Sequence, residues 1–142
     1  MMGPVDEVEP LERAVASVGD RWTLLVVHAL LDGPRRFGEL AEAVPGLAPN
    51  ILTRRLRHLE HEGLVVATPY SRRPLRVTYE LTATGRDLAG ALALLSEWGA
   101  RQAGTAALRH HVPCGTSLEA RWWCPTCDRA VVDDETDELR YA

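Results

Sequence analysis

The sequence predicts a mainly α-helical domain that carries a small β-hairpin, an α+β fold. Four helical segments come first, two β-branched runs follow them, and one long helix comes last. The chain of 142 residues is 46% apolar and 25% charged. That composition is enough for a packed core, and the length leaves no room for a large two-lobed enzyme.

The first two helices are predicted from their apolar spacing and their capping residues. Apolar side chains recur at helical intervals through residues 11–18, and Gly19 follows as a natural end. Asp20 is a good N-cap for a second helix, in which apolar residues from Trp22 to Leu31 cover most of the circumference. This second helix is therefore expected to be central and buried, with His28 packed in the core or in an interface.

The third and fourth helices form a short helix, a tight turn and a longer helix. Residues 37–44 place their apolar side chains on one face of a two-turn helix that ends at Pro45. The fourth helix begins near Ala48, with Pro49 in its first turn, and ends at Gly63. Its buried stripe is predicted to consist of Leu52, Leu56 and Leu59.

A β-hairpin and a last helix complete the predicted fold. Residues 64–70 are expected to form a strand, residues 71–74 a polar turn, and residues 75–81 a second, alternating strand. Thr82 then caps a single long helix that is expected to reach about Ala103. The apolar face of that helix comprises Leu88, Ala91, Leu92, Leu95 and Trp98. This order of elements is typical of the winged helix-turn-helix plan.

The net charge of −4 hides a basic centre. Residues 1–12 carry four acidic residues and no base, and residues 128–142 carry six acidic residues against two arginines. Residues 13–127 hold fourteen arginines against ten acidic residues, and the chain has no lysine. The positive charge therefore lies where a polyanionic partner would meet the predicted fold.

Arginines on the fourth helix and the hairpin predict contacts with double-stranded DNA. A recognition helix lies in the major groove, where arginine forms bidentate bonds to guanine and asparagine reads adenine. We expect Asn50, Arg54 and Arg57 to read bases. The remaining predicted DNA contacts, at the helix margins or on phosphates and the minor groove, are Arg36, Thr53, Arg55, His61, Arg72, Arg73 and Arg76. The alternative is that this helix face is merely solvated.

Several segments carry the motifs of a known family. They are GDRWTLLVVHALLDGPRRFGEL, LTRRLRHLEHEGLV, PLRVTYELTATGRDL and LSEWGA. In this order and spacing the chain resembles the HxlR family of bacterial transcription regulators, relatives of the MarR type, from about Glu9 to Gln102. The resemblance implies a homodimeric winged-helix repressor or activator, with Ala48–Glu62 as recognition helix and with dimer contacts from the first and last helices.

Residues typical of this family are present in the chain at some positions and absent at one. The family's Trp corresponds to Trp22, and its Arg-Phe pair to Arg36-Phe37. Many members carry a cysteine about thirteen residues before that Trp, used in some as a thiol sensor, but Glu9 stands there in this chain. Because a carboxylate cannot be oxidised or alkylated in that way, thiol sensing at this position is not expected.

All three cysteines lie beyond the resemblance, in the last thirty residues. The segment contains His111-x2-Cys114 and, further on, Cys124-x2-Cys127. Two short knuckles of this spacing, separated by a strand-like stretch, resemble a zinc ribbon, and three Cys with one His complete a closed structural zinc set. His110 is the alternative to His111 as the fourth ligand, and three reduced cysteines in a loosely packed tail are the alternative to zinc.

Two other functional classes stay open. One is a protein-interaction module that uses the winged helix without DNA, and the other is a redox protein that uses the Cys124 and Cys127 thiols. Enzyme activity is not expected, because the sequence has no phosphate-binding glycine loop, nucleophile elbow or HExxH helix. A small-molecule effector pocket would lie between the dimer helices.

The predicted organisation has four parts. These are an acidic tail at 1–8, the winged-helix domain at 9–104, the zinc-ribbon-like module at 105–132 and an acidic tail at 133–142. The start of the chain lacks the basic and apolar regions of a secretory signal, and the longest apolar run is eight residues. We therefore expect a soluble, cytoplasmic protein without a membrane partner.

Overall fold

The computed structural model describes residues 9–105 and 109–131. The predicted acidic tails lie outside these residues. The chain divides into two units, Met1–Leu92 and Ala93–Ala142, and each is described by itself. Within the described part of the chain, no helix has the length and apolar character that a membrane crossing requires.

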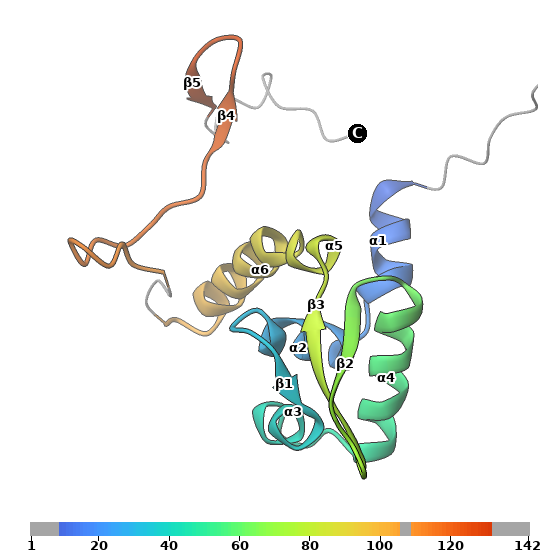
Figure 1. Cartoon of the computed structure of the whole chain (residues 1–142). Helices are drawn as coiled ribbons and strands as arrows, with labels where there is room; N and C mark the ends of the chain where they lie inside the picture. The colour runs from blue at the N-terminus through green and yellow to red at the C-terminus, as the bar shows by residue number, and fades with distance from the viewer. Residues whose placement is uncertain (1–8, 106–108, 132–142) are drawn as a thin grey trace, which may run out of the picture. The chain divides into compact units, whose positions relative to one another are not determined.

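The four expected helices are present in the first unit (Figure 1). They are α1 (Pro10–Val18), α2 (Arg21–Leu30), α3 (Phe37–Ala43) and α4 (Pro49–His61). The Asp20 carboxylate accepts hydrogen bonds from the backbone N–H groups of Trp22 and Thr23 at 3.0 and 3.1 Å, so it caps α2 as expected. Gly63 follows α4 with a φ of +70°, the left-handed conformation that ends a helix.

The hairpin belongs to a three-stranded antiparallel sheet of order β1-β3-β2. Its strands are β1 (Arg35–Arg36), β2 (Val65–Arg72) and β3 (Leu75–Leu81). The short strand β1, which the sequence analysis did not predict, pairs Arg35 with Tyr79 and Arg36 with Thr78. The winged helix-turn-helix fold is thereby confirmed, with β1 as the third strand of its sheet.

The hairpin turn is tighter than expected. The ladder continues through the pairs Ser71–Arg76 and Arg72–Leu75, which leaves Arg73 and Pro74 as the connection. The Ser71 hydroxyl donates to the carbonyl of Pro74 at 3.0 Å and stabilises this end of the hairpin. The prediction of a four-residue turn at 71–74 was therefore wrong, because cross-strand pairing extends further than the apolar pattern of the strands.

The prediction of a single long helix after Thr82 was wrong. The structure has a one-turn helix, α5 (Ala83–Arg86), and a separate helix, α6 (Ala89–Gln102). Thr82 does cap α5, since its hydroxyl accepts from the Gly85 N–H at 3.1 Å. Gly85 is packed so closely that an added Cβ would lie 2.2 Å from the Leu64 carbonyl oxygen. Gly85 and Gly90 both weaken a continuous helix at this point.

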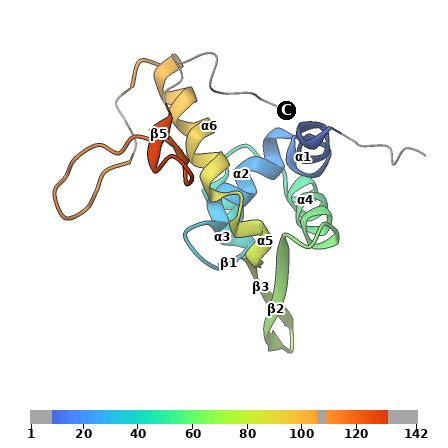
Figure 2. The ribbon, with the colours of Figure 1, turned by 90° about the horizontal axis from the view of Figure 1, so that it is seen from above.

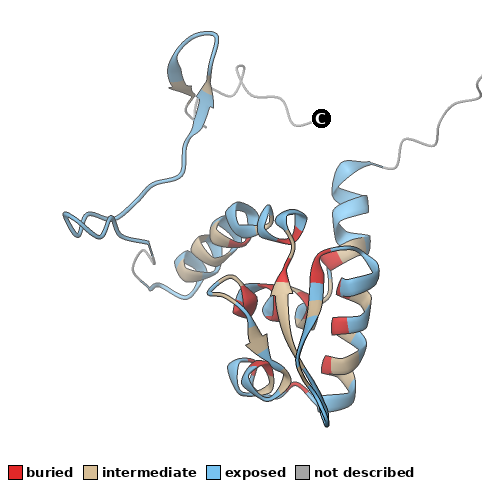
Figure 3. Cartoon of the chain, viewed as in Figure 1, coloured by how far each residue is buried: buried red, intermediate tan, exposed pale blue. Residues whose placement is uncertain are grey.

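The hydrophobic core lies between the helices and one end of the sheet (Figure 3). Leu52, Leu56 and Leu59 of α4 are all 1% exposed or less, which confirms the predicted stripe. The core also takes in Val26, Val27 and Leu30 of α2, Leu40 of α3, Leu64, Val65 and Leu81 of the sheet, and Leu92 of α6. His28 is exposed, so it does not pack in the core, and the alternative of packing in an interface stays a prediction.

The second unit contains two small hairpins. The strands β4 (Trp122–Cys124) and β5 (Arg129–Val131) pair antiparallel, and an isolated bridge joins His110 to Ser117. None of the described residues from 109 to 131 is buried. This segment therefore has no apolar core of its own in the structure.

Candidate nucleic-acid interface

The outer face of α4 is polar, exposed and basic. Asn50, Arg54, Arg57 and His61 are exposed, whereas the leucines of the same helix face the core. Within residues 9–105 and 109–131, neither Arg54 nor Arg57 forms an ion pair. Thr53 is half-buried, and its hydroxyl donates to the Pro49 carbonyl at 3.0 Å within the helix. The two exposed arginines are the strongest groups this face offers to an anion.

Arg55 is held differently from its neighbours. It is half-buried, and its Nη1 lies 3.2 Å from Oδ2 of Asp20, the residue that caps α2. Asp20 also accepts a hydrogen bond from the hydroxyl of Thr23, which is fully buried. Arg55 therefore connects α4 to α2 in the structure, and the phosphate contact expected of it stays a prediction.

The environment of Asp20 lowers its pKa. Burial raises the pKa of this carboxyl, but the hydrogen bonds from Thr23, the charge of Arg55 and the Trp22 N–H together outweigh burial. Asp20 is thus held in its charged form at the junction of α2 and α4. A charged cap is the form that stabilises the N-terminus of α2.

The C-terminal end of α4 is tied to α1. The imidazole Nε2 of His58 lies 2.6 Å from the Ser17 carbonyl oxygen and donates to it, because a carbonyl can only accept. The Ser17 hydroxyl donates to the Glu62 carboxylate at 3.2 Å. His58 is thus a structural residue, and neither interaction was visible in the sequence because about forty residues separate the partners.

The wing carries the second group of basic residues. Arg72, Arg73 and Arg76 are all exposed at the end of the β2–β3 hairpin. Figure 1 shows the hairpin running beside α4, and Figure 2 shows it extending beyond the helices of the first unit. An extended, positively charged hairpin next to a basic helix face is suited to a duplex, in which phosphates flank each groove.

The two arginines of β1 differ in their contacts. The Nε of Arg35 donates to the Ala29 carbonyl at 2.7 Å, and its Nη2 lies 3.4 Å from Asp32. The guanidinium of Arg36 instead stacks over the Tyr70 ring of β2, 4.5 Å from its centroid. Tyr70 lies at the irregularity of β2 between Pro69 and Ser71. Arg36 remains exposed and is therefore the β1 arginine available to a phosphate.

The predicted metal ligands lie in two pairs. His111 Nδ1 is 3.3 Å from Cys114 Sγ in the first hairpin, and Cys124 and Cys127 share hydrogen bonds in the second. Hydrogen bonds from Thr116 lower the pKa of the Cys114 thiol, and the backbone N–H and side chain of Cys127 lower that of Cys124. Nowhere among the described residues do three such ligands gather around one point.

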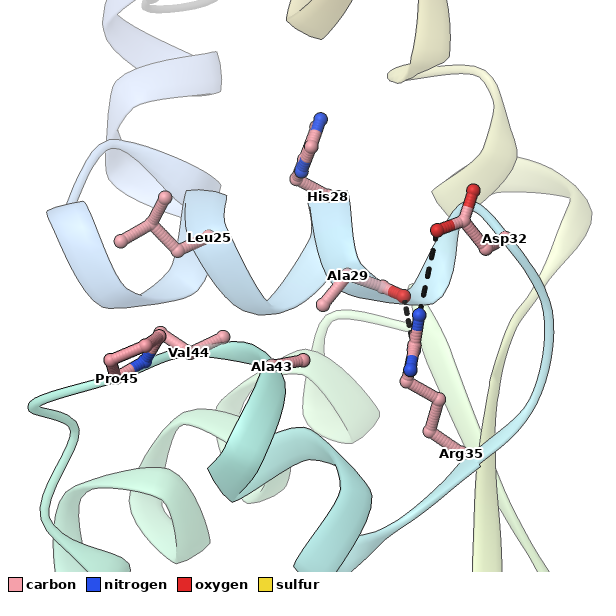
Figure 4. A pocket seen from close by; sticks show the side chains of 8 residues that line it. All are labelled: Leu25, His28, Ala29, Asp32, Arg35, Ala43, Val44 and Pro45. Atoms are coloured by element: carbon pink, nitrogen blue, oxygen red, sulfur yellow. Dashed lines mark hydrogen bonds and ion pairs between the residues drawn. The ribbon is translucent and has the colours of Figure 1, made fainter.

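A cavity of about 290 Å³ opens between α2 and the end of α3 (Figure 4). Its polar lining is largely engaged, since Arg35 bonds to Ala29 and Asp32. Figure 4 shows the imidazole of His28 pointing away from Ala43 and Val44. The cavity thus offers mainly apolar surface, and it is a different place from the predicted effector pocket between dimer helices, which stays a prediction.

Comparison with known proteins gives consistent matches. The model of a family described as HxlR-like helix-turn-helix matches residues 17–107. An uncharacterized HTH-type transcriptional regulator of Mycobacterium bovis is 39% identical over 130 residues, which cover 88% of this chain and 81% of the relative. Because 88% of the chain is covered, the similarity to this relative continues beyond residue 107, where the family match ends, into the C-terminal segment.

Two solved structures are also similar. The reduced form of the redox regulator HypR superposes with a TM-score of 0.63 at 32% identity, covering 66% of this chain and 93% of HypR. The reduced form of the transcriptional regulator YodB from B. subtilis gives a TM-score of 0.57 at 33% identity, covering 71% of this chain and 94% of YodB. The Mycobacterium bovis relative and YodB are described as transcriptional regulators and HypR as a redox regulator, in agreement with the expectation that this chain is not an enzyme.

Proposed function

Because the chain belongs to the HxlR-like helix-turn-helix family of transcriptional regulators, we propose that it binds specific double-stranded DNA as a homodimer. In this proposal α4 enters the major groove, and the β2–β3 wing contacts the backbone or the minor groove. The observation that carries it is a contrast on α4: Arg54 and Arg57 are exposed and form no ion pair with any residue that the structure describes, whereas Arg55 is paired with Asp20.

Base reading is assigned to one face of α4. Arg54 and Arg57 are separated by one helical turn, so both project from the side opposite the buried leucines. Each guanidinium could form a bidentate pair with O6 and N7 of a guanine, and Asn50 in the first turn could read an adenine. The His58 and Arg55 contacts would hold this helix rigidly against the body while it is docked.

Phosphate contacts are assigned to the wing and to β1. Arg72, Arg73 and Arg76 would lie along one strand of the duplex, and Arg36 would be held toward it by its stacking on Tyr70. These contacts carry no sequence information by themselves. They would supply salt-dependent affinity and set the orientation of α4 in the groove.

The homodimer is supported by exposed apolar side chains on α1 and α6. Leu11 and Val15 of α1 are 67% and 57% exposed, and Leu95 and Trp98 of α6 are 51% and 55% exposed. Only part of the apolar face of α6 is used by the core: Leu92 is buried there, whereas Leu95 and Trp98 are exposed. A second copy of this chain is the occupant that the family assigns to such helices, and a two-fold dimer matches a palindromic site.

Thiol sensing of the kind suggested by the names of HypR and YodB would need other residues in this chain. Residues 9–105 contain no cysteine. The Glu9 carboxylate, which stands where many family members carry the sensor, accepts from the Glu12 N–H at 3.0 Å and caps α1. Any redox response would therefore depend on Cys114, Cys124 and Cys127.

The proposal is tested by selecting DNA fragments from a random pool with the purified full chain. The expected result is enrichment of a palindromic sequence whose half-sites lie about one helical turn apart. Affinity for the selected site should fall steeply with salt, because arginines that neutralise phosphates release counterions. Failure to enrich any sequence, or affinity that stays flat between low and moderate salt, would favour the alternative of a protein-interaction module.

A further inference from the structure

The C-terminal segment contains two hairpins built on the same local plan. In the first, a bridge pairs His110 with Ser117, and the His111 N–H donates to the Thr116 carbonyl at 2.8 Å. The chain turns within this hairpin through hydrogen bonds from the Cys114 and Gly115 N–H groups to the His111 carbonyl, at 3.2 and 2.7 Å. His111 and Cys114 therefore lie on either side of one tight turn.

The second hairpin repeats this arrangement. The strands β4 and β5 pair Cys124 with Arg129, and the turn between them carries Cys127. Hydrogen bonds from the backbone N–H groups of Thr126 and Cys127 reach the Cys124 thiol, so the turn presents donors to that sulfur. The spacing of the two ligand residues, with two residues between them, is the same as in the first hairpin.

A backbone feature links the two turns. Gly115 directly follows Cys114 with a φ of +70°, and Asp128 directly follows Cys127 with a φ of +53°. Asp128 is the one residue other than glycine with a positive φ in the described part of the chain. Because this conformation is unfavourable for most side chains, its occurrence at the equivalent position of both turns indicates a shared geometric requirement.

Residues 109–131, the described part of this segment, have no apolar core that would hold the two hairpins together. No described residue from 109 to 131 is buried, and Trp122 and Trp123 are 55% and 60% exposed. Ordering a residue costs about 1–2 kcal/mol of backbone entropy, which a segment without a core cannot recover. Short segments of this kind depend on a cross-link such as a metal ion or a disulfide.

We propose that the two hairpins are zinc knuckles and that one Zn²⁺ joins them through His111, Cys114, Cys124 and Cys127. Three thiolates and one imidazole form a closed tetrahedral set, and the thiols lose their protons as the metal binds. The structure shows the ligands as two separate pairs. Residues 118–121 connect the His110–Ser117 bridge to β4 and are all exposed, so no core packing keeps the hairpins apart.

The geometry selects His111 over His110 as the fourth ligand. His111 Nδ1 already lies 3.3 Å from the Cys114 sulfur, a separation compatible with two ligands of one tetrahedral ion. His110 lies one residue earlier, at the bridge position that pairs with Ser117. Because neighbouring residues of a strand point to opposite faces, only one of the two imidazoles can be directed toward the thiolates.

The test measures metal content in the full chain, purified under reducing conditions without chelator. We expect about one zinc per chain, released by a reagent that modifies thiols. Replacement of zinc by cobalt should give the visible absorption of a tetrahedral thiolate site. A reduced wild-type chain that binds neither metal, and whose Cys124 and Cys127 form a reversible disulfide, would overturn the proposal.

Matched variants test the ligand set. Cys114→Ser, Cys124→Ser, Cys127→Ser and His111→Ala should each lower the zinc affinity by about tenfold or more, whereas His110→Ala should bind like the wild type. Binding of each variant to the selected DNA site reports whether its winged helix remains folded. Unchanged affinity in the cysteine variants would overturn the site, and loss in His110→Ala with retention in His111→Ala would overturn the choice of histidine.

Discussion

The guanidinium of Arg55 lies 3.2 Å from the carboxylate of Asp20, so the candidate recognition helix α4 is joined to the N-terminal cap of α2. The same carboxylate accepts the backbone N–H groups of Trp22 and Thr23. One acidic side chain therefore caps the start of α2 and contacts α4. This contact helps to orient α4, whose exposed Arg54 and Arg57 are the residues proposed to read DNA.

Replacement of Asp20 should destabilise the domain. Asp20→Ala removes the helix cap and the partner of Arg55, and we expect a loss of about 1–2 kcal/mol in the free energy of unfolding. Asp20→Asn should lose less, because an asparagine side chain also caps helices well. Urea unfolding followed by circular dichroism measures both values. Equal stability of the alanine variant and the wild type would contradict the role assigned to Asp20.

The same carboxylate gives a prediction about pH. The folded-state pKa of Asp20 is lowered, so its contribution to stability is fully present above the unfolded value of about 3.9 and is lost as the pH falls through the folded value. The stability difference between the wild type and Asp20→Asn should therefore be constant near neutral pH and shrink in acid. A difference that grows on acidification would contradict the direction of the shift.

Arg54 and Arg55 should behave differently although they are adjacent. Arg54→Ala should relax the preference at one base pair of each half-site by about 1–3 kcal/mol and leave stability unchanged. Arg55→Ala should keep the base preference and lower the unfolding midpoint, because it releases the contact with Asp20. Binding to the selected site and to single-base variants measures the preference. A change of base preference in Arg55→Ala alone would reverse the assignment.

Local features of the fold were predictable from the sequence. The limits of α1 to α4 follow from apolar spacing and from caps such as Asp20 and Gly63, which act within a few residues. The strand β1 was missed because two residues carry no periodic signal and become a strand only by pairing with β3. Near the break between α5 and α6, the close packing of Gly85 on the Leu64 carbonyl is a contact between distant residues that has no sequence pattern.

In the candidate site, too, local features were predictable from the sequence and contacts between distant residues were not. Exposure of Asn50, Arg54 and Arg57 follows from helical periodicity, which places them opposite the buried leucines. The pairing of Arg55 with Asp20, across 35 residues, has no sequence pattern of its own. The stacking of Arg36 on Tyr70 likewise depends on β1 lying in the sheet. Sequence alone could therefore identify the basic face but could not separate its freely exposed arginines from those held by contacts within the domain.

The wing should contribute affinity without specificity. Arg73→Ala should weaken binding to all sequences alike and reduce the slope of log affinity against log salt by about one for each wing. Arg121→Ala is the matched control, because Arg121 is an exposed arginine of the second unit that pairs with Glu119. A salt titration of binding measures both. Equal slopes for the Arg73 variant and the control would remove the wing from the interface.

The last prediction concerns the dimer. Leu95→Asp on α6 and Val15→Asp on α1 place a charge on exposed apolar faces, so each should dissociate the homodimer with little effect on the fold of the chain. Leu75→Asp is the control, since Leu75 is 70% exposed on the wing and belongs to neither helix. Sedimentation velocity gives the mass of each species. The two monomeric variants should also bind a palindromic site more weakly, because the half-sites are then occupied independently. A wild-type chain that sediments as a monomer, or an unchanged dimer in both variants, would show that these faces serve another contact.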